Sequence, residues 1–241
     1  MTRRFLILCF AVGLLALGGL NAQAGQISLP ATLDNFVPPP ATNNAPPPGG
    51  NYAIVGGNLE FSEFTYSATS SAGGTPPPAP SGVTVAAFTS VPGETGIVFS
   101  GGFHAPVNTM VDYSITFQVT ALSGSITDAY LLVNGGSSGN GTFLVTEAIT
   151  NAANGAALMP PASLNASDSG VPVVSSWSGV TSISVTKDIF LDGGTTGTGS
   201  TVSIVEQGFS SIPEPASMAL LGIGLSGLFT LRRFLKRTSV A

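Results

Sequence analysis

The chain has 241 residues, a net charge of −5 and one cysteine. Between Gly25 and Ser211 it has a single basic residue, Lys187, and eleven acidic ones, so one positive and eleven negative charges leave this region at −10. Nucleic acid is excluded as a partner, because phosphate binding needs clustered Lys and Arg. A zinc site of Cys and His is excluded too, since the region holds one histidine and no cysteine, and no cofactor is expected.

The N-terminal residues 1–24 are predicted to be a signal peptide. Arg3-Arg4 forms a positive start and Phe5–Leu20 an apolar stretch. The small residues that signal peptidase needs before its cleavage site are Ala22 and Ala24. The arginine pair also allows a twin-arginine signal, but the strongly hydrophobic flank fits that poorly. The mature chain is therefore expected outside the cytoplasm.

Two proline clusters follow the signal peptide. Val37–Asn51 contains six prolines, which lack the N–H that a sheet requires, so it predicts polyproline II or coil. Residues 25–52 are accordingly predicted to be a Pro-rich spacer ahead of one domain at 53–211. The shorter cluster at Thr75–Gly82 is expected to form a long hairpin loop.

The pattern of the region 53–211 is that of β-strands. Val111–Ala121 alternates apolar and polar residues without exception, which indicates a strand with one buried face. Further stretches rich in β-branched and aromatic residues are predicted strands: Leu59–Tyr66, Val83–Phe88, Gly96–His104, Ile126–Val133, Gly141–Ile149, Val180–Val185, Ile189–Leu191 and Thr201–Phe209. The fold class is therefore all-β, as a single antiparallel β-sandwich or jelly-roll-like domain.

Residues that could catalyse a reaction are few. Gly135–Gly139 matches the nucleophile-elbow string, but that motif needs a turn from strand to helix, and strands are predicted on both sides. His104 is expected to be a surface or loop residue. Glu60 and Glu63 are spaced to lie on opposite faces of a strand. The protein is thus expected not to be an enzyme, with glycan cleavage by two carboxylates as a remaining alternative.

Three residues are candidates for ligand binding. Trp177 lies between polar residues and could stack on a sugar, although a lone tryptophan is also expected to fill the core with its N–H bonded to a nearby carbonyl. Asp188 and Asp192 are four apart and would share one face of a strand, where loop carbonyls could complete a calcium site. Nothing near them resembles the spacing of a calcium loop, so no metal ligand is assigned.

The C-terminal residues 212–237 combine a Pro-Glu-Pro triplet, an uncharged run at 216–231 and a basic cluster. The run has 16 residues and would reach about 24 Å as a helix at ~1.5 Å per residue, less than a hydrocarbon core of about 30 Å. It predicts a marginal transmembrane helix. The basic cluster is expected to stay in the cytoplasm and consists of Arg232, Arg233, Lys236 and Arg237.

This arrangement resembles the PEP-CTERM sorting domain of exported bacterial proteins, which are substrates of exosortase-type enzymes. The residues that carry the resemblance are Pro213, Glu214, Pro215, Ala216 and Ser217. The resemblance implies that a membrane-embedded exosortase recognises the triplet and releases the protein from a transient inner-membrane anchor. Delivery to the cell envelope or extracellular matrix of a Gram-negative bacterium would follow. An ordinary membrane anchor with a chance triplet is the alternative.

The sequence therefore favours an exported β-domain protein with a structural or adhesive role, which signal peptidase and an exosortase would process. A second hypothesis makes the domain a module that binds exopolysaccharide or calcium in a biofilm matrix.

Overall fold

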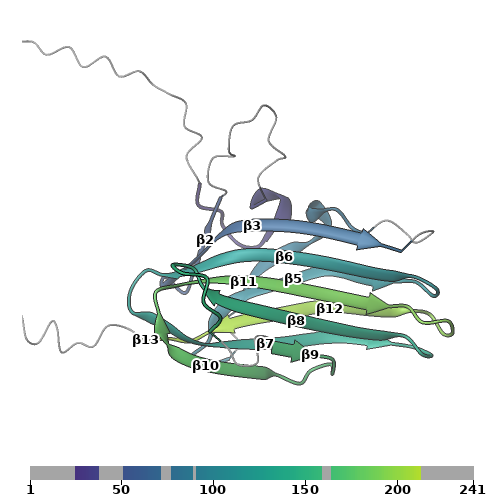
Figure 1. The fold of residues 1–241 in the computed structure, drawn as a ribbon. Helices are drawn as coiled ribbons and strands as arrows, with labels where there is room; N and C mark the ends of the chain where they lie inside the picture. The colour runs from purple at the N-terminus through teal and green to yellow at the C-terminus, as the bar shows by residue number, and fades with distance from the viewer. Residues whose placement is uncertain (1–24, 38–50, 72–76, 89–90, 159–163, 213–241) are drawn as a thin grey trace, which may run out of the picture.

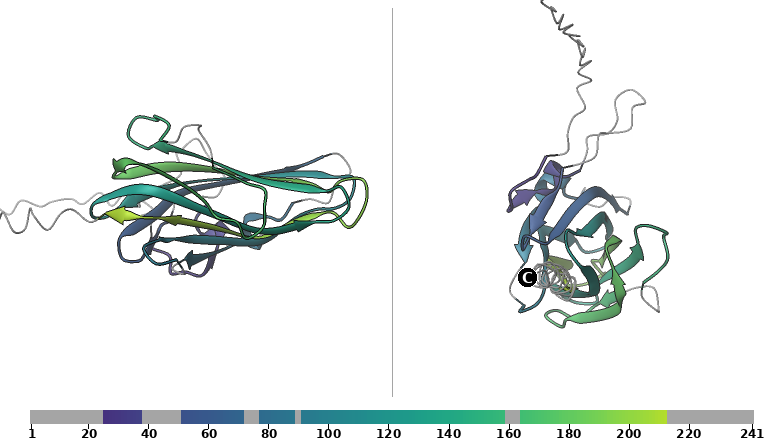
Figure 2. Two further views of the ribbon diagram at one scale, coloured as in Figure 1. Left: turned by 90° about the horizontal axis from the view of Figure 1, so that it is seen from below. Right: turned by 90° about the vertical axis from the view of Figure 1, so that its left-hand side faces the viewer.

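The computed structural model describes residues 25–37, 51–71, 77–88, 91–158 and 164–212, and these form two antiparallel β-sheets packed face to face. The described residues contain no α-helix, only two short 3-10 turns at Leu33–Asn35 and Pro80–Gly82. The strands run along the long axis of an elongated domain (Figures 1 and 2). The prediction of an all-β antiparallel sandwich is confirmed.

The first sheet has seven strands in the order β1-β4-β5-β12-β7-β10, and β13 also pairs with β7. Their bounds are β1 (Ala31–Thr32), β4 (Thr84–Phe88), β5 (Thr95–Ala105), β12 (Ser200–Phe209), β7 (Ser125–Ser137), β10 (Val173–Val180) and β13 (Ser211–Ile212). The second sheet has the order β2-β3-β6-β11-β8-β9. Its strands are β2 (Ala53–Val55), β3 (Leu59–Ser70), β6 (Met110–Ala121), β11 (Ser182–Asp192), β8 (Thr142–Asn151) and β9 (Leu164–Ala166).

The core lies between the two sheets, because alternate residues of each long strand point inward. On β6 the apolar residues of the predicted alternation are buried or nearly so, and the polar ones face outward. Phe117 of β6 is at the centre of an aromatic cluster that joins both sheets. Its ring centroid lies 6.2 Å from that of Phe61, 5.4 Å from that of Phe64 and 5.8 Å from that of Phe99 on the opposite sheet.

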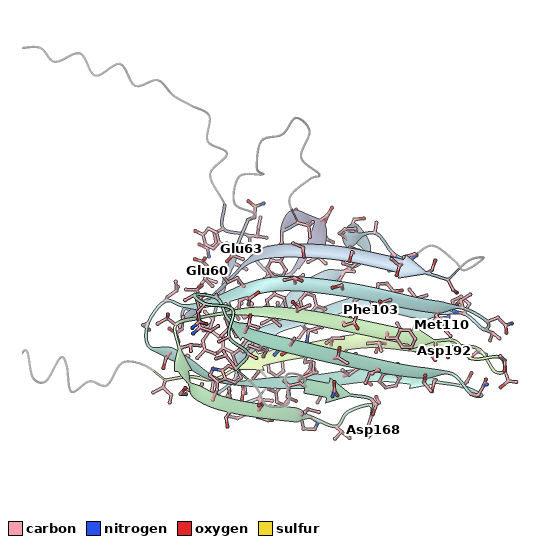
Figure 3. All side chains as sticks on the ribbon, viewed as in Figure 1. Glu60, Glu63, Phe103, Met110, Asp168 and Asp192 are labelled. Atoms are coloured by element: carbon pink, nitrogen blue, oxygen red, sulfur yellow. The ribbon has the colours of Figure 1, made fainter. Side chains whose placement is uncertain are left out.

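A β-bulge on β3 changes which residues share a face. The pairing with β6 shifts between Ser62 and Thr65, and Glu63 adopts a φ of 56°. Phe61 and Phe64 are therefore both buried although they are three residues apart. Neither Glu60 nor Glu63 is buried (Figure 3). The expectation that these two glutamates lie on opposite faces is wrong, because it assumed a regular strand.

Two further differences concern β10 and β11. The break predicted between Val185 and Ile189 does not exist, since β11 is continuous and pairs along its whole length with β6. The sequence there contains Lys187, a residue that strands rarely bury. β10 was not predicted because it has serines on both of its faces and an exposed valine, Val174, so its composition is that of a loop and its sequence has no apolar–polar alternation.

The folded domain begins before residue 53, where the spacer was expected to end. Leu33 and Phe36 are buried in the core, and β1 pairs with β4. Phe36 packs on Phe64, with ring centroids 5.0 Å apart. Residues 31–36 thus belong to the domain because they supply apolar side chains between β4 of the first sheet and β3 of the second.

Several predicted segments lie outside the described residues. They are the signal peptide at 1–24, most of the proline cluster at 38–50, and the Pro-Glu-Pro triplet, apolar run and basic cluster at 213–237. Within the part of the chain that the structure describes, no helix is long and apolar enough to cross a membrane.

Candidate functional site

The C-terminal end of the domain is fixed at the point where the tail begins. β13 pairs with the start of β7, Ser211 opposite Ile126 and Ile212 opposite Ser125 (Figure 1). The next residue is Pro213, which has no N–H and therefore cannot continue the ladder. The sequence ends the strand directly before the Pro-Glu-Pro triplet.

Ser210, the residue before β13, makes four hydrogen bonds, one of them from the Thr127 hydroxyl to the Ser210 carbonyl at 3.5 Å. Its backbone N–H donates to Asp128 Oδ1 at 2.8 Å, its carbonyl accepts from the Thr127 N–H at 3.1 Å, and its hydroxyl donates to Glu94 Oε1 at 3.3 Å. The Asn58 amide, from the loop between β2 and β3, donates to the Ser211 hydroxyl. Both sheets therefore hold the last residues of the domain.

The exit is lined by carboxylates. Burial, and secondarily the charge of Asp128, raise the pKa of Glu94 above its usual range, while the Ser210 hydroxyl opposes this shift. Residues 25–211 are acidic as a whole, and Glu94 and Asp128 add negative charge beside Ser210. The point where the chain leaves the domain therefore has a negative electrostatic potential.

A second polar arrangement lies inside the sandwich. Lys187 of β11, Glu147 of β8 and Gln207 of β12 are all fully buried. The Lys187 Nζ donates to Glu147 Oε2 and, at 2.7 Å, to Gln207 Oε1. Glu147 is the cross-strand partner of Lys187 in the second sheet, whereas Gln207 comes from the first. We call these three residues the buried polar centre.

The buried polar centre is enclosed by apolar residues. The other strand partners of its members are all buried aliphatic residues: Ile97, Ile115, Leu131 and Leu164. Burial lowers the pKa of the Lys187 ammonium and raises the pKa of the Glu147 carboxyl, and the attraction between the two groups opposes both shifts. Desolvation thus favours the neutral forms of both groups.

Sequence reasoning missed the buried polar centre. Lys187 is the single basic residue between Gly25 and Ser211, and the period-two pattern of its strand puts it in phase with Val185 and Ile189. Those two signals together could have placed it on the inward face. Which acidic residue meets it could not be read from the sequence, because Glu147 is forty positions away.

Trp177 lies on β10 and packs against the core with part of its ring exposed. Its indole N–H donates to the Ile126 carbonyl at 3.1 Å. The expectation that a nearby carbonyl satisfies this N–H is confirmed. The bond uses the polar atom of the side chain that could otherwise have contacted a sugar hydroxyl.

Asp188 and Asp192 lie on β11, in the sheet opposite Trp177, so the structure does not bring the three ligand-binding candidates together. Asp192 is at one end of the sandwich next to Met110, its partner on β6 (Figure 3). Its carboxylate accepts the Gly194 N–H at 2.8 Å. At ~3.3 Å per residue, four residues along a strand separate the two aspartates by about 13 Å. Among the described residues no three His, Cys, Asp or Glu side chains gather as a metal site would require.

Asp188 instead has Asp112 as a neighbour. Phe190 pairs with Asp112, and Asp188 with Ser114, so the two aspartates are diagonal neighbours on the outer face of the second sheet. Burial first, then a hydrogen bond with Asp112 and its charge, raise the pKa of Asp188 from 3.8 to about 6.

This shift predicts a pH dependence of stability. Between pH 3.8 and about 6 the folded protein keeps the Asp188 proton that the unfolded chain releases, so stability should decrease as the pH rises through this window. Asp188→Asn should make the decrease shallower, and Asp112→Asn should do the same because it removes the neighbour. Urea denaturation between pH 3.5 and 7 would measure both. An Asp188→Asn variant with the full wild-type slope would contradict the assignment.

The remaining candidates are isolated. His104, near the end of β5, is exposed, and its backbone N–H and carbonyl contact the Tyr113 hydroxyl. The Gly135–Gly139 string runs from the end of β7 into the turn before β8. No helix follows its serine, so the geometry of a nucleophile elbow is not present there.

The comparisons with known proteins concern the tail first. Residues 211–233 match the PEP-CTERM protein-sorting motif family. The domain is thus an antiparallel β-sandwich with a sorting signal that begins at its last strand, β13. The chain carries a PEP-CTERM motif, which implies an exported, membrane-processed cell-envelope protein and a substrate of exosortase.

No curated protein matches the sequence. Solved structures that resemble it distantly include the following two. TmCBM61, solved with β-1,4-galactotriose, is 10% identical with a TM-score of 0.33, and the match covers 62% of this chain and 88% of that one. The enzymatically active domain of bacteriophage CBA120 tailspike protein 4 is 17% identical with a TM-score of 0.28, over 61% of this chain and 19% of that one. TM-scores this low assign neither a fold nor a ligand to this chain.

Proposed function

We propose that this protein is a non-enzymatic structural or adhesive component of the cell envelope or extracellular matrix of a Gram-negative bacterium. The observation that carries the delivery of the domain to this location is the position of the sorting motif. The matched region begins at Ser211, inside β13, so the signal starts where the folded domain ends. Cleavage after this point would release an intact sandwich, because no strand of the described domain lies beyond Ile212.

The division of the chain follows from this proposal. Residues 1–24 direct export and are removed by signal peptidase. The run at 216–231 anchors the precursor in the inner membrane with its basic cluster in the cytoplasm, and the exosortase acts at Pro213, Glu214 and Pro215. The domain is the part that reaches its final location.

Glu214→Ala should block this processing, since the triplet would lose its charged member. We expect the mature form to decrease at least about tenfold and the precursor to accumulate in the inner-membrane fraction of the host. Cell fractionation with mass spectrometry of the C-terminus would measure this. Glu63→Ala, which removes an exposed glutamate from the bulge on β3, is the matched control and should be processed normally. Wild-type protein that keeps its tail outside the inner membrane would contradict the proposal.

A second candidate function is the binding of exopolysaccharide or calcium. The observation that favours it is the partly exposed carboxyl pair of Asp112 and Asp188 on the outer face of a strongly acidic domain. Calorimetry of the protein against the polysaccharide of its host, with and without calcium, separates the two functions. Heat that disappears in Asp188→Asn, Asp192→Asn or Trp177→Ala would support binding. Absence of heat and of a thermal shift would leave the structural role.

A further inference from the structure

The buried polar centre contains three groups that can together form an amide bond. They are an amine, a carboxamide and a carboxyl group that can carry a proton. We infer that Lys187 and Gln207 become joined by an isopeptide bond, which the folded protein forms by itself with Glu147 as the catalytic residue. Lys187 belongs to one sheet and Gln207 to the other, so the bond would link the two layers covalently. The inference goes beyond the proposed function and does not depend on it.

The geometry brings the reacting atoms together. The Lys187 Nζ is 2.7 Å from the Gln207 Oε1. With a carbonyl bond of about 1.23 Å and a contact angle of at least about 90°, the amide carbon lies roughly 3–4 Å from Nζ. Reacting atoms in a near-attack arrangement are about 3–3.5 Å apart. The neighbouring strands hold the backbones of Lys187, Glu147 and Gln207 in place, because all three residues are paired in β-ladders.

The environment activates both the amine and the acid. Lys187 is enclosed by aliphatic side chains, and this desolvation favours the neutral amine, the form with a free lone pair. The Glu147 Oε2 contacts Nζ and can accept its proton. Glu147 therefore contacts the attacking nitrogen.

The reaction balances without any other reactant. The Nζ lone pair forms a bond to the Gln207 Cδ, and the bond between Cδ and Nε2 breaks with its electron pair staying on Nε2. One proton moves from Nζ to Glu147 and from Glu147 to Nε2, so Nε2 leaves as ammonia. Glu147 ends in its starting protonation state.

Two atoms of the centre lack hydrogen-bond partners and fit this chemistry. The Gln207 Nε2 and the Glu147 Oε1 are buried without a partner among the described residues. A buried amide nitrogen with no acceptor is costly in a finished structure, and its departure as ammonia removes that cost. The region 25–211 contains no cysteine, so a disulfide cannot link the sheets there.

Protease fragments of the denatured full chain test the inference. Cleavage after glutamate separates a fragment 148–206, which contains Lys187, from a fragment that begins at Gln207. We expect these two to remain joined and to weigh one ammonia molecule less than their sum. Separate fragments with the masses of the sequence would overturn the inference. A fragment 95–206 that is uncut at Glu147 and one water molecule lighter than its sequence, with the Gln207 fragment free, would indicate a bond between Lys187 and Glu147 and would overturn it too.

Variants identify the catalytic residue. Glu147→Gln should reduce the joined fraction at least about tenfold, because a general acid-base group contributes ~10²-fold or more to rate. Lys187→Met should give only separate fragments. Gln118→Leu changes a glutamine on the outer side of β6 and should keep the fragments joined. Unchanged joining in Glu147→Gln would overturn the catalytic role, and the wild-type digest decides the bond itself even if a variant does not fold.

Discussion

Lys187→Met should lower the free energy of unfolding by about 3–5 kcal/mol, the usual effect of removing one partner of a buried ion pair. Lys187 is fully buried and contacts Glu147 and Gln207, which are equally inaccessible to water. Methionine leaves the carboxyl group without a partner in an apolar interior. A covalent bond between Lys187 and Gln207 would increase the loss in the same direction. Urea denaturation at pH 7 would measure the change.

The matched control replaces the whole buried polar centre by apolar side chains of similar volume, as Lys187→Met, Glu147→Leu and Gln207→Leu together. Removing all three polar groups leaves no unpaired charge, so this variant should be more stable than Lys187→Met alone. If Lys187→Met were as stable as the wild type, the contacts of this centre would contribute nothing to stability.

Phe117→Ala should lower the free energy of unfolding by about 3–5 kcal/mol through the loss of buried area and the cavity it leaves. Phe117 is 1% exposed and its ring contacts Phe61 and Phe64 in its own sheet and Phe99 in the other. These aromatic pairs stabilise the fold by more than the burial of their surface area alone would. The cavity would lie between the sheets, where relaxation is limited because both layers are held by ladders.

Denaturation of Leu144→Ala provides the comparison. Leu144 is on β8 and is 37% exposed, so its truncation should change stability by no more than about 0.5 kcal/mol. A Phe117→Ala effect as small as that of Leu144→Ala would mean that the aromatic cluster does not join the sheets.

The strands were predictable where the two faces of the sheet differ chemically. The alternation at Val111–Ala121 identified β6 almost to the residue, because every inward position is apolar. The same rule failed on β11, where Lys187 occupies an inward position, and on β10, where serines dilute the apolar pattern. Local pattern cannot reveal the distant partner that a buried polar residue requires.

The candidate sites also fall into two groups, those that the sequence predicted and those that it did not. The sorting signal is a contiguous string that an enzyme reads in the chain, so its residues were found from the sequence. The contacts of Asp188 with Asp112 and of Lys187 with Gln207 join different strands, and strand order is not written in local spacing. Trp177 lies in one sheet and Asp188 and Asp192 lie in the other, and this separation also depends on strand order.

The sequence by itself determined the fold class and the sorting signal, because both depend on contiguous patterns of hydrophobicity and residue type. Only the tertiary structure decided that a lysine, a glutamate and a glutamine meet in the core, and that the chain leaves the domain at Ile212 held by both sheets. Those arrangements result from pairing between strands far apart in the chain. Register and sheet order, which packing of the whole domain fixes, set which side chains touch.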